Sequence, residues 1–266
     1  MEHYDVVFKK RFGQNFLKRR AVVERIANVC SLTSDDLVIE VGPGGAILTQ
    51  ELAKRSGQVL AYEIDVDLKE ELFKKLVDFS NVDVLFQDFL TSSLQDDISK
   101  YDYKNLYFIS NVPYYITTPI IMKIIDSQLD FKKICMMVQK EVGNRFSALP
   151  GSREYGSISV FLSYFYNIKK EFLVSRKEFV PEPNVDSVVV SFTRKDTLLP
   201  LKDEKLFFKV VKDSFQFKRK NLRNNLKNYD LNAIFLVLEK YGYDLTVRAE
   251  QLSVEIFVEI ANQLAI

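Results

Sequence analysis

Short apolar runs alternate with helical periodicity through the first 140 residues. Runs rich in Val, Ile, Leu and Phe predict strands, and apolar residues three and four apart between them predict helices. The expected strands are residues 37–41, 59–64, 82–86, 106–110 and 134–138, and the expected helices are residues 22–30, 47–55, 66–78 and 119–126. Strands and helices that alternate in this way predict an α/β fold, with a parallel sheet covered by helices on both faces.

Downstream of residue 138 the alternation ends. The pattern predicts helices at residues 140–148 and 157–165, then strands at residues 170–174 and 187–192, and from residue 203 onward only helices, at residues 204–215, 231–241 and 253–264. Pro181 and Pro183 favour an extended path between the two strands. The segment 194–202, which contains Pro200, is the expected boundary. We therefore expect an α/β domain over residues 1–196 and a small all-helical domain over residues 197–266.

The composition excludes several classes of site. His3 is the only histidine and Cys30 and Cys135 are the only cysteines, so no zinc site, other metal site or disulfide framework is expected. A Ser-His-Asp or Cys-His mechanism is disfavoured for the same reason. No apolar run reaches the ~20 residues that a membrane helix needs, and the first 20 residues lack the apolar stretch of a signal peptide. A cytoplasmic location is expected, and nothing in the sequence demands more than a monomer.

The net charge of +1, from 37 basic and 36 acidic residues, hides two basic clusters. Residues 9–20 contain Lys9, Lys10, Arg11, Lys18, Arg19 and Arg20, and residues 216–227 contain Lys218, Arg219, Lys220, Arg223 and Lys227, with no acidic residue in either segment. Local clusters on a nearly neutral chain indicate an anionic partner, although a solvated helix face is the simpler alternative. On a helix, Arg219 and Arg223 would share one face.

The first expected strand runs into the glycine-rich turn Glu40-Val-Gly-Pro-Gly44. Glycines at a strand-to-helix turn let a ligand approach the backbone, but such a motif alone also fits a strained turn without a ligand. Polar residues also end the next three strands. Glu63 lies 21 positions after Gly42, and Asp88 and Asn111 follow. Because such sheets bind ligands at the carboxyl ends of their strands, and place an acid near this spacing against ribose hydroxyls, a nucleoside cofactor is expected there.

Two features of the turn bear on which cofactor binds. Ala46 stands where a dinucleotide motif has its third glycine, and Pro43 removes one backbone donor that a pyrophosphate would use. The turn therefore favours a smaller ligand, such as the methionine part of S-adenosylmethionine, over NAD.

The segment Asn111-Val-Pro-Tyr114 indicates the chemistry. An adenine amine is a weak nucleophile because its lone pair is delocalised into the ring. Its two N–H groups could donate hydrogen bonds to the Asn111 side-chain carbonyl and to the backbone carbonyl of Val112 or Pro113, while Tyr114 stacks on the base. Such a reaction needs positioning and electrostatics rather than a general base, on a base that has been unstacked. The alternative is an ordinary strand-end turn that uses proline for stiffness and tyrosine for burial.

The sequence resembles the ribosomal RNA adenine dimethyltransferase family of the KsgA/RsmA type. Five blocks in the same order carry the resemblance: Phe12-Gly-Gln-Asn-Phe-Leu17, Glu40-Val-Gly-Pro-Gly44, Asn111-Val-Pro-Tyr-Tyr-Ile-Thr-Thr-Pro119, Phe179-Val-Pro-Glu-Pro-Asn-Val-Asp-Ser187 and Phe215-Gln-Phe-Lys-Arg-Lys-Asn-Leu-Arg-Asn-Asn-Leu226. The resemblance implies a Rossmann-like class I methyltransferase sheet followed by a small helical domain. It also implies transfer of methyl groups from S-adenosylmethionine to N6 of two adjacent adenines near the 3′ end of small-subunit (16S) ribosomal RNA, within an immature 30S particle.

The resemblance also assigns roles by position. The expected cofactor contacts are Asn15, Leu17, Gly42, Gly44, Glu63, Asp88 and Asn111; the expected catalytic residues are Asn111, Pro113, Tyr114 and Phe179, the last packing near the target base; and the expected RNA contacts are Lys9, Lys10, Arg11, Arg219, Lys220 and Arg223. Two positions depart from the family pattern. Ala46 replaces a common glycine, so the turn is expected to be tighter on the ligand, and Asn184 replaces a frequent lysine, which removes one expected phosphate contact.

Two rival functions remain open. The Erm type shares the fold and methylates large-subunit ribosomal RNA, but Pro119 stands where those enzymes usually carry an acidic residue, and the pI near 7.6 is low for them. A non-catalytic ribosome-assembly or transcription factor on this fold is the other, and the intact Glu63 and Asn111-Val-Pro-Tyr114 disfavour it.

Overall fold

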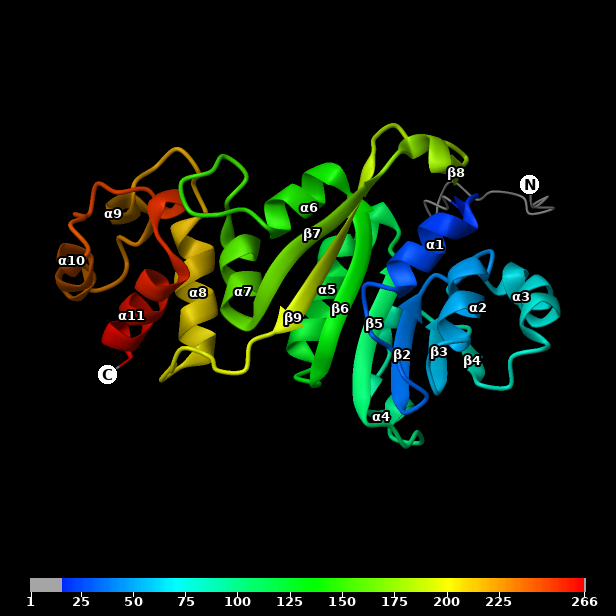
Figure 1. The fold of residues 1–266 in the computed structure, drawn as a ribbon. Helices are drawn as coiled ribbons and strands as arrows, with labels where there is room; N and C mark the ends of the chain where they lie inside the picture. The colour runs from blue at the N-terminus through cyan, green and yellow to red at the C-terminus, as the bar shows by residue number, and fades with distance from the viewer. Residues whose placement is uncertain (1–15, 266) are drawn as a thin grey trace. The chain divides into compact units, whose positions relative to one another are not determined.

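A computed structural model describes residues 16–265, and a seven-stranded sheet is its centre (Figure 1). The strand order is β4-β3-β2-β5-β6-β9-β7, where β2 is Asp36–Val41, β3 Gln58–Tyr62, β4 Val82–Leu85, β5 Asn105–Asn111, β6 Phe131–Gln139, β7 Tyr166–Val174 and β9 Ser187–Arg194. Neighbouring strands from β4 to β6 are parallel, whereas β9 runs antiparallel to β6. The α/β prediction is confirmed, with a mixed rather than wholly parallel sheet.

Both faces of the sheet are covered, as the continuous apolar runs predicted. On one face α1 (Arg20–Ala27) and α2 (Ile47–Ala53) bury Val23 and Leu52 in a core that includes Tyr107 of β5. The next residue of β5, Phe108, points to the opposite face. There its ring lies 5.9 Å from that of Phe89 in the short 3-10 helix η3 (Phe89–Thr91), against which α5 (Thr117–Asp126) packs.

Shorter elements complete this part of the chain. They are the 3-10 helices η2 (Val66–Leu68), η4 (Tyr114–Ile116) and η5 (Arg176–Glu178), and the helices α3 (Lys69–Leu76) and α4 (Leu94–Ile98). A separate two-stranded pair joins β1 (Phe16–Leu17) to β8 (Phe179–Val180), with Leu17 opposite Phe179. This pair brings Phe16 and Leu17 beside the start of the Phe179–Ser187 block, a contact that no sequence periodicity predicts.

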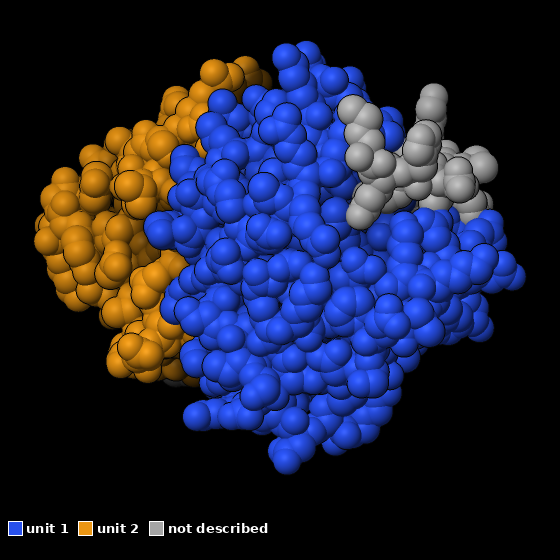
Figure 2. All heavy atoms as spheres, turned by 45° about the vertical axis from the view of Figure 1, so that its right-hand side comes forward, with its two compact units in different colours: residues 1–143, 169–193 blue, residues 144–168, 194–266 orange. Residues whose placement is uncertain are grey.

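The chain divides into two compact units, shown in separate colours in Figure 2. One contains residues 1–143 and 169–193, and the other contains residues 144–168 and 194–266. This differs from the expected division at residue 197, because residues 144–168, with helix α7 (Ser157–Phe165), pack with the later helices. Helix α6 (Lys140–Phe146) crosses the boundary between the units.

The second unit consists mainly of helices: α7, α8 (Glu204–Ser214), α9 (Leu222–Asn225), α10 (Leu231–Lys240), η6 (Ala249–Gln251) and α11 (Val254–Leu264). Aromatic rings form its core, with Phe161 4.7 Å from Phe208 and Tyr164 5.1 Å from Phe207. Asp203 begins α8 by accepting a 3.0 Å hydrogen bond from the Leu206 backbone. Within residues 16–265 no helix is long and apolar enough to span a bilayer.

Candidate functional site

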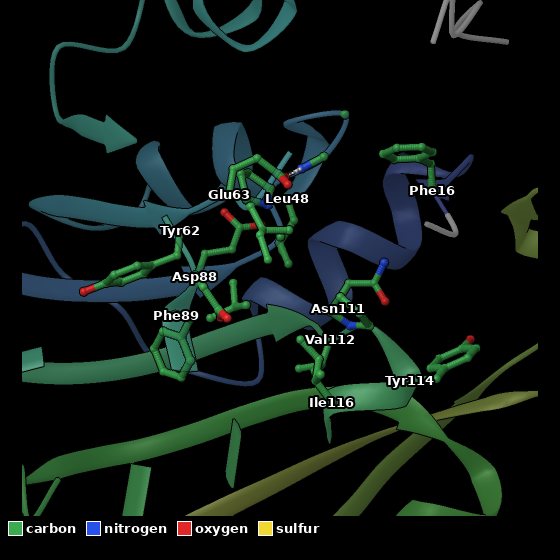
Figure 3. A pocket seen from close by; sticks show the side chains of 18 of the residues that line it. Phe16, Leu48, Tyr62, Glu63, Asp88, Phe89, Asn111, Val112, Tyr114 and Ile116 are labelled. Carbon is green, nitrogen blue, oxygen red and sulfur yellow. Dashed lines mark hydrogen bonds between the residues drawn. The ribbon is translucent and has the colours of Figure 1, made fainter. Parts of the chain in front are cut away.

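A cavity of about 220 Å³ opens at the carboxyl ends of β2, β3 and β5 (Figure 3). It is lined by the glycine turn and by the residues at or just after the strand ends. Among the predicted site residues, the lining contains Leu17, Gly42, Gly44, Glu63, Asp88, Asn111, Pro113 and Tyr114. Segments from five parts of the sequence therefore meet at one site, as the strand-end argument predicted.

The glycine turn after β2 uses left-handed backbone at alternate positions. The φ angles of Gly42, Gly44 and Ala46 are 73°, 51° and 63°. A Cβ on Gly44 would lie 2.5 Å from Cε1 of Phe16, whose ring also lines the cavity. Ala46 adopts this left-handed conformation although it carries a Cβ, at a cost of roughly 1–2 kcal/mol.

Glu63 lies immediately after β3 and is almost fully buried. Its Oε2 accepts a hydrogen bond from the backbone N–H of Gly44 at 3.2 Å, and its Oε1 accepts one from the N–H of Asp65 at 2.9 Å. Burial raises the pKa of this carboxyl, and the two backbone donors oppose that rise. The carboxylate therefore faces the cavity in a fixed position and can accept hydroxyl donors from a ligand.

A second acid, Glu40, also lines the cavity, and the sequence reasoning gave it no role of its own. Its side chain is fully buried at the end of β2, and among the described residues its Oε2 has no hydrogen-bond partner. Burial, assisted by the negative charge of Glu63, raises the pKa of Glu40 to about 8. An acid at the start of a glycine turn is the sequence signal that could have singled it out.

Asp88 starts η3, where its Oδ1 accepts a hydrogen bond from the Leu90 backbone at 2.9 Å. Lys123 of α5 anchors the same loop, because its Nζ donates to the carbonyls of Leu90 and Ser92 at 3.0 and 2.6 Å. The carboxylate of Asp88 is thereby held at the cavity wall, one strand away from Glu63.

The Asn111-Val-Pro-Tyr segment forms a tight turn between β5 and α5. Asn111 is the last residue of β5, and the Thr117 hydroxyl donates to the carbonyl of Tyr114 at 3.2 Å. The Tyr114 hydroxyl lies 2.7 Å from Oγ of Ser187. Burial raises the pKa of Tyr114, so its phenol stays neutral and suits stacking rather than proton transfer. Figure 3 shows Asn111 and Tyr114 on one side of the cavity and Glu63 and Asp88 on the other.

One predicted catalytic residue is not at the cavity. Phe179 is fully buried in the core beside Leu17 and Val23, and it is not part of the cavity lining. Pairing of β8 with β1 directs its side chain into this core, and its packing against a target base stays a prediction. Asn15, Lys9, Lys10 and Arg11 lie outside the described residues.

Arg219 and Arg223 do not share the face of one helix. Arg219 and Lys220 lie in a loop, and Arg223 lies in the short α9. Asn225 closes the loop by accepting from the Phe217 backbone at 3.1 Å, while Asn221 caps α9. The three cations are nevertheless exposed, as predicted.

Tyr115 is a lining residue that the sequence reasoning missed. Its side chain is 56% exposed, although it forms part of the cavity wall. Burial of the remainder, together with the charges of Asp88 and Glu63, raises the pKa of its phenol. Its place directly after the Asn111–Tyr114 segment was the available signal.

The mixed sheet with a glycine turn after β2 defines a Rossmann-like methyltransferase of class I. Two solved structures share the fold: the 23S rRNA methyltransferase ErmE (TM-score 0.72, 26% identity, 94% of this chain and 99% of that one) and a dimethyladenosine transferase from Plasmodium falciparum (TM-score 0.76, 24% identity, 92% and 95%). The model of the family "Ribosomal RNA adenine dimethylase" matches residues 6–265. The chain belongs to this family.

Curated relatives agree with this assignment. The "Ribosomal RNA small subunit methyltransferase A" proteins of Streptococcus thermophilus (strain ATCC BAA-491 / LMD-9) and Streptococcus pneumoniae serotype 2 are 39% and 40% identical to this chain. Each alignment spans 273 positions, 99% of this chain and 94% of the relative. The family resemblance predicted from the sequence is confirmed.

Proposed function

We propose that this chain transfers methyl groups from S-adenosylmethionine to N6 of two adjacent adenines in small-subunit ribosomal RNA. The placement of Asn111 and Tyr114 opposite Glu63 in one cavity carries the proposal, because it pairs a site for an adenine amine with a site for a nucleoside cofactor. The names of the relatives at about 40% identity support the small subunit as substrate.

The residues at the cavity fit S-adenosylmethionine. Gly42 and Gly44 have positive φ and line the cavity without a side chain, and the Glu63 carboxylate has acceptor capacity for two ribose hydroxyls. Asp88 stands at the neighbouring strand end, where it can accept from the amine of the cofactor adenine. When bound, S-adenosylmethionine supplies an electrophilic methyl group on a sulfonium.

The residues of this chain act on the nucleophile. The two N–H groups of the target amine donate hydrogen bonds to the Asn111 side-chain carbonyl and to a backbone carbonyl of the turn, from Val112 or Pro113. These bonds favour a more pyramidal nitrogen. Tyr114 stacks on the extruded base and orients it. Preorganised acceptors and stacking lower the barrier without a general base.

A basic surface on the second unit is the proposed RNA contact. Arg219, Lys220 and Arg223 are exposed, and the described part of the chain places no carboxylate in an ion pair with them. The exposed ring of Phe217 lies in the same loop and offers a base a stacking partner. Lys9, Lys10 and Arg11 form the second proposed contact, outside the described residues.

The finer points of the proposal come from the family resemblance. The substrate is taken to be ribosomal RNA within an immature 30S particle, and the enzyme is taken to act as a cytoplasmic monomer. Two rival functions define the alternatives, a large-subunit specificity like that in the name of ErmE and a non-catalytic role in assembly.

A single experiment separates the three functions. Protein and labelled S-adenosylmethionine are incubated with immature small subunits or with large-subunit RNA, and the nucleosides are analysed by mass spectrometry. We expect N6,N6-dimethyladenosine in the small-subunit RNA, and none with Asn111→Ala. Methylation of the large-subunit RNA would support the Erm-type function, and cofactor binding without methylation of either RNA would support the assembly role.

A further inference from the structure

The Tyr114 hydroxyl and Oγ of Ser187 lie 2.7 Å apart, although the two residues are 73 positions apart in the sequence. Tyr114 belongs to the turn that follows β5, and Ser187 is the first residue of β9. Ser187 is fully buried. The bond therefore links the Asn111–Tyr114 segment to the end of the Phe179–Ser187 block, two motifs whose connection the sequence does not reveal.

Both ends of this bond have a fixed backbone. Ser187 stands opposite Gln139 in the β6–β9 ladder, and the carbonyl of the preceding residue, Asp186, accepts from the Lys140 backbone at 3.0 Å. On the other side, the Thr117 hydroxyl holds the Tyr114 carbonyl. Once these backbones are fixed, the torsions of the Tyr114 side chain decide where its ring lies, and the hydroxyl bond constrains them.

We propose that Ser187 is a positioning residue for methyl transfer, holding the Tyr114 ring in the orientation that stacks on the target base. This inference rests on the function proposed above. Burial raises the pKa of the Tyr114 phenol above its ordinary value, so the hydroxyl is protonated at neutral pH and the bond is present there. The ring is thus placed before the base arrives, which reduces the ordering that base binding requires.

A buried serine could instead serve only the packing of β9, and the same strand offers a matched control. Ser191 is also buried, and its Oγ donates a 2.7 Å hydrogen bond to Glu171 rather than to a cavity residue. Ser191→Ala therefore removes a buried hydroxyl and its bond from β9 without touching Tyr114. A packing role predicts the same behaviour for Ser187→Ala and Ser191→Ala, whereas positioning predicts different behaviour.

The first measurement needs neither cofactor nor RNA. With 3-fluorotyrosine introduced at position 114 alone, we expect a single sharp ¹⁹F resonance in the parent protein and in Ser191→Ala. In Ser187→Ala the resonance should shift and broaden, because the ring samples further orientations. A Ser187→Ala spectrum identical to that of the parent protein would overturn the positioning role.

The second measurement follows single turnover on immature small subunits. Ser187→Ala and Tyr114→Phe should each lower the rate about fivefold, the effect of one lost hydrogen bond, and the double variant should lose no more than either single variant. S-adenosylmethionine affinity should stay unchanged. Should Ser187→Ala fail to fold, Tyr114→Phe removes the same bond with β9 intact and decides the question. Parental rates in the variants, or fully additive losses, would overturn the inference; an inactive parent protein would instead overturn the proposed function.

Discussion

The backbone N–H of Gly44 donates a 3.2 Å hydrogen bond to Oε2 of Glu63, which joins the glycine turn after β2 to the residue that follows β3. The N–H of Asp65 donates to the other carboxylate oxygen at 2.9 Å. Each oxygen keeps a lone pair for a further donor. The acid is therefore oriented by the protein before a ligand binds, and its two oxygens can receive the two hydroxyls of a ribose.

Glu63→Ala should weaken S-adenosylmethionine binding. Hydrogen bonds to a charged group contribute roughly 1.5–3 kcal/mol, so the Kd should rise by about ten- to a hundredfold. Titration calorimetry on the folded variant measures this, with the exposed Glu70→Ala on α3 as control. Unchanged affinity in Glu63→Ala would remove this residue from the site, and tight NADH binding by the parent protein would contradict the choice of cofactor.

The same affinity should depend on pH. Because burial raises the pKa of Glu63, its carboxylate takes up a proton at a higher pH than an exposed glutamate does. Protonation removes acceptor capacity, so the Kd for S-adenosylmethionine should rise as the pH falls through the raised pKa. Calorimetry from pH 5 to pH 8 should show this rise in the parent protein. In Glu63→Gln, which cannot titrate, a rise of equal size would assign the dependence to another group.

Glu40→Gln should stabilise the protein at alkaline pH. The native state keeps the Glu40 proton up to a pKa of about 8, whereas the unfolded chain releases it near 4.5. Between these values the folded state binds more protons, so stability falls as pH rises, by on the order of 3 kcal/mol for this group. Urea unfolding at pH 5.5 and pH 8 checks this. The advantage of the variant should grow with pH, and a constant difference would show that Glu40 is ionised in the native state.

Gly44→Ala should destabilise the glycine turn through Phe16. The added Cβ meets Cε1 of Phe16 at 2.5 Å, and overpacking of this kind typically costs about 1–3 kcal/mol. Gly151 is a matched control, because it also has positive φ but a Cβ there meets nothing within 4 Å. In urea unfolding, Gly44→Ala should lose more stability than Gly151→Ala. In a chain that already carries Phe16→Ala, Gly44→Ala should lose no more stability than Gly151→Ala does. Equal losses at both glycines would leave backbone strain as the whole effect.

Asn111→Ala should abolish methyl transfer, because the target amine loses its side-chain acceptor. Tyr114→Ala should lower the rate by the ~1–3 kcal/mol of one base–aromatic stack, about five- to a hundredfold or more. Tyr114→Phe keeps the ring and should lose only the roughly fivefold effect of its hydroxyl bond. Single-turnover rates on immature small subunits distinguish these variants. If Tyr114→Phe were as inactive as Tyr114→Ala, the hydroxyl rather than the stack would be the essential group.

The strand ends were predictable from the sequence because parallel strands share one direction. Apolar runs located β2, β3, β4 and β5, and the residues that follow parallel strands must meet at one edge of the sheet. That geometry alone brings Glu63, Asp88 and Asn111 to one cavity. The roles of these three residues came from the family resemblance, because their spacing in the sequence does not determine which ligand group each one contacts.

Contacts between distant segments were not predictable in this way. Phe179 lies in the core because β8 pairs with β1, and neither two-residue strand has a periodicity to detect. The Ser187–Tyr114 bond joins the start of β9 to the turn after β5, two segments with no common spacing. Around Arg219 the residue spacing fits a helix, but the structure has a loop followed by the short α9. The Asn225 side chain accepts from the Phe217 backbone, and the Asn221 side chain caps α9. Such side-chain bonds to the backbone compete with helical hydrogen bonds.

Charge reversal of Arg219, Lys220 and Arg223 to glutamate should weaken binding to the small ribosomal subunit. A cavity that holds one adenine and one cofactor cannot select one RNA helix among many. Selection of the RNA must therefore come from surfaces outside the cavity. An RNA backbone would be recognised at this surface through its phosphate charge and shape, without reading of base edges.

Salt dependence separates this role from simple solvation of the loop. Each lost phosphate contact lowers the slope of log K against log salt by roughly 0.7–0.9, so the triple variant should lose about two units of slope or more. Reversal of the exposed Lys202, Lys205 and Lys212, in the same unit, makes an equal charge change and is the control. S-adenosylmethionine affinity should be unchanged in both variants. A triple variant at 219, 220 and 223 with parental affinity and parental salt slope would show that these cations only solvate the surface.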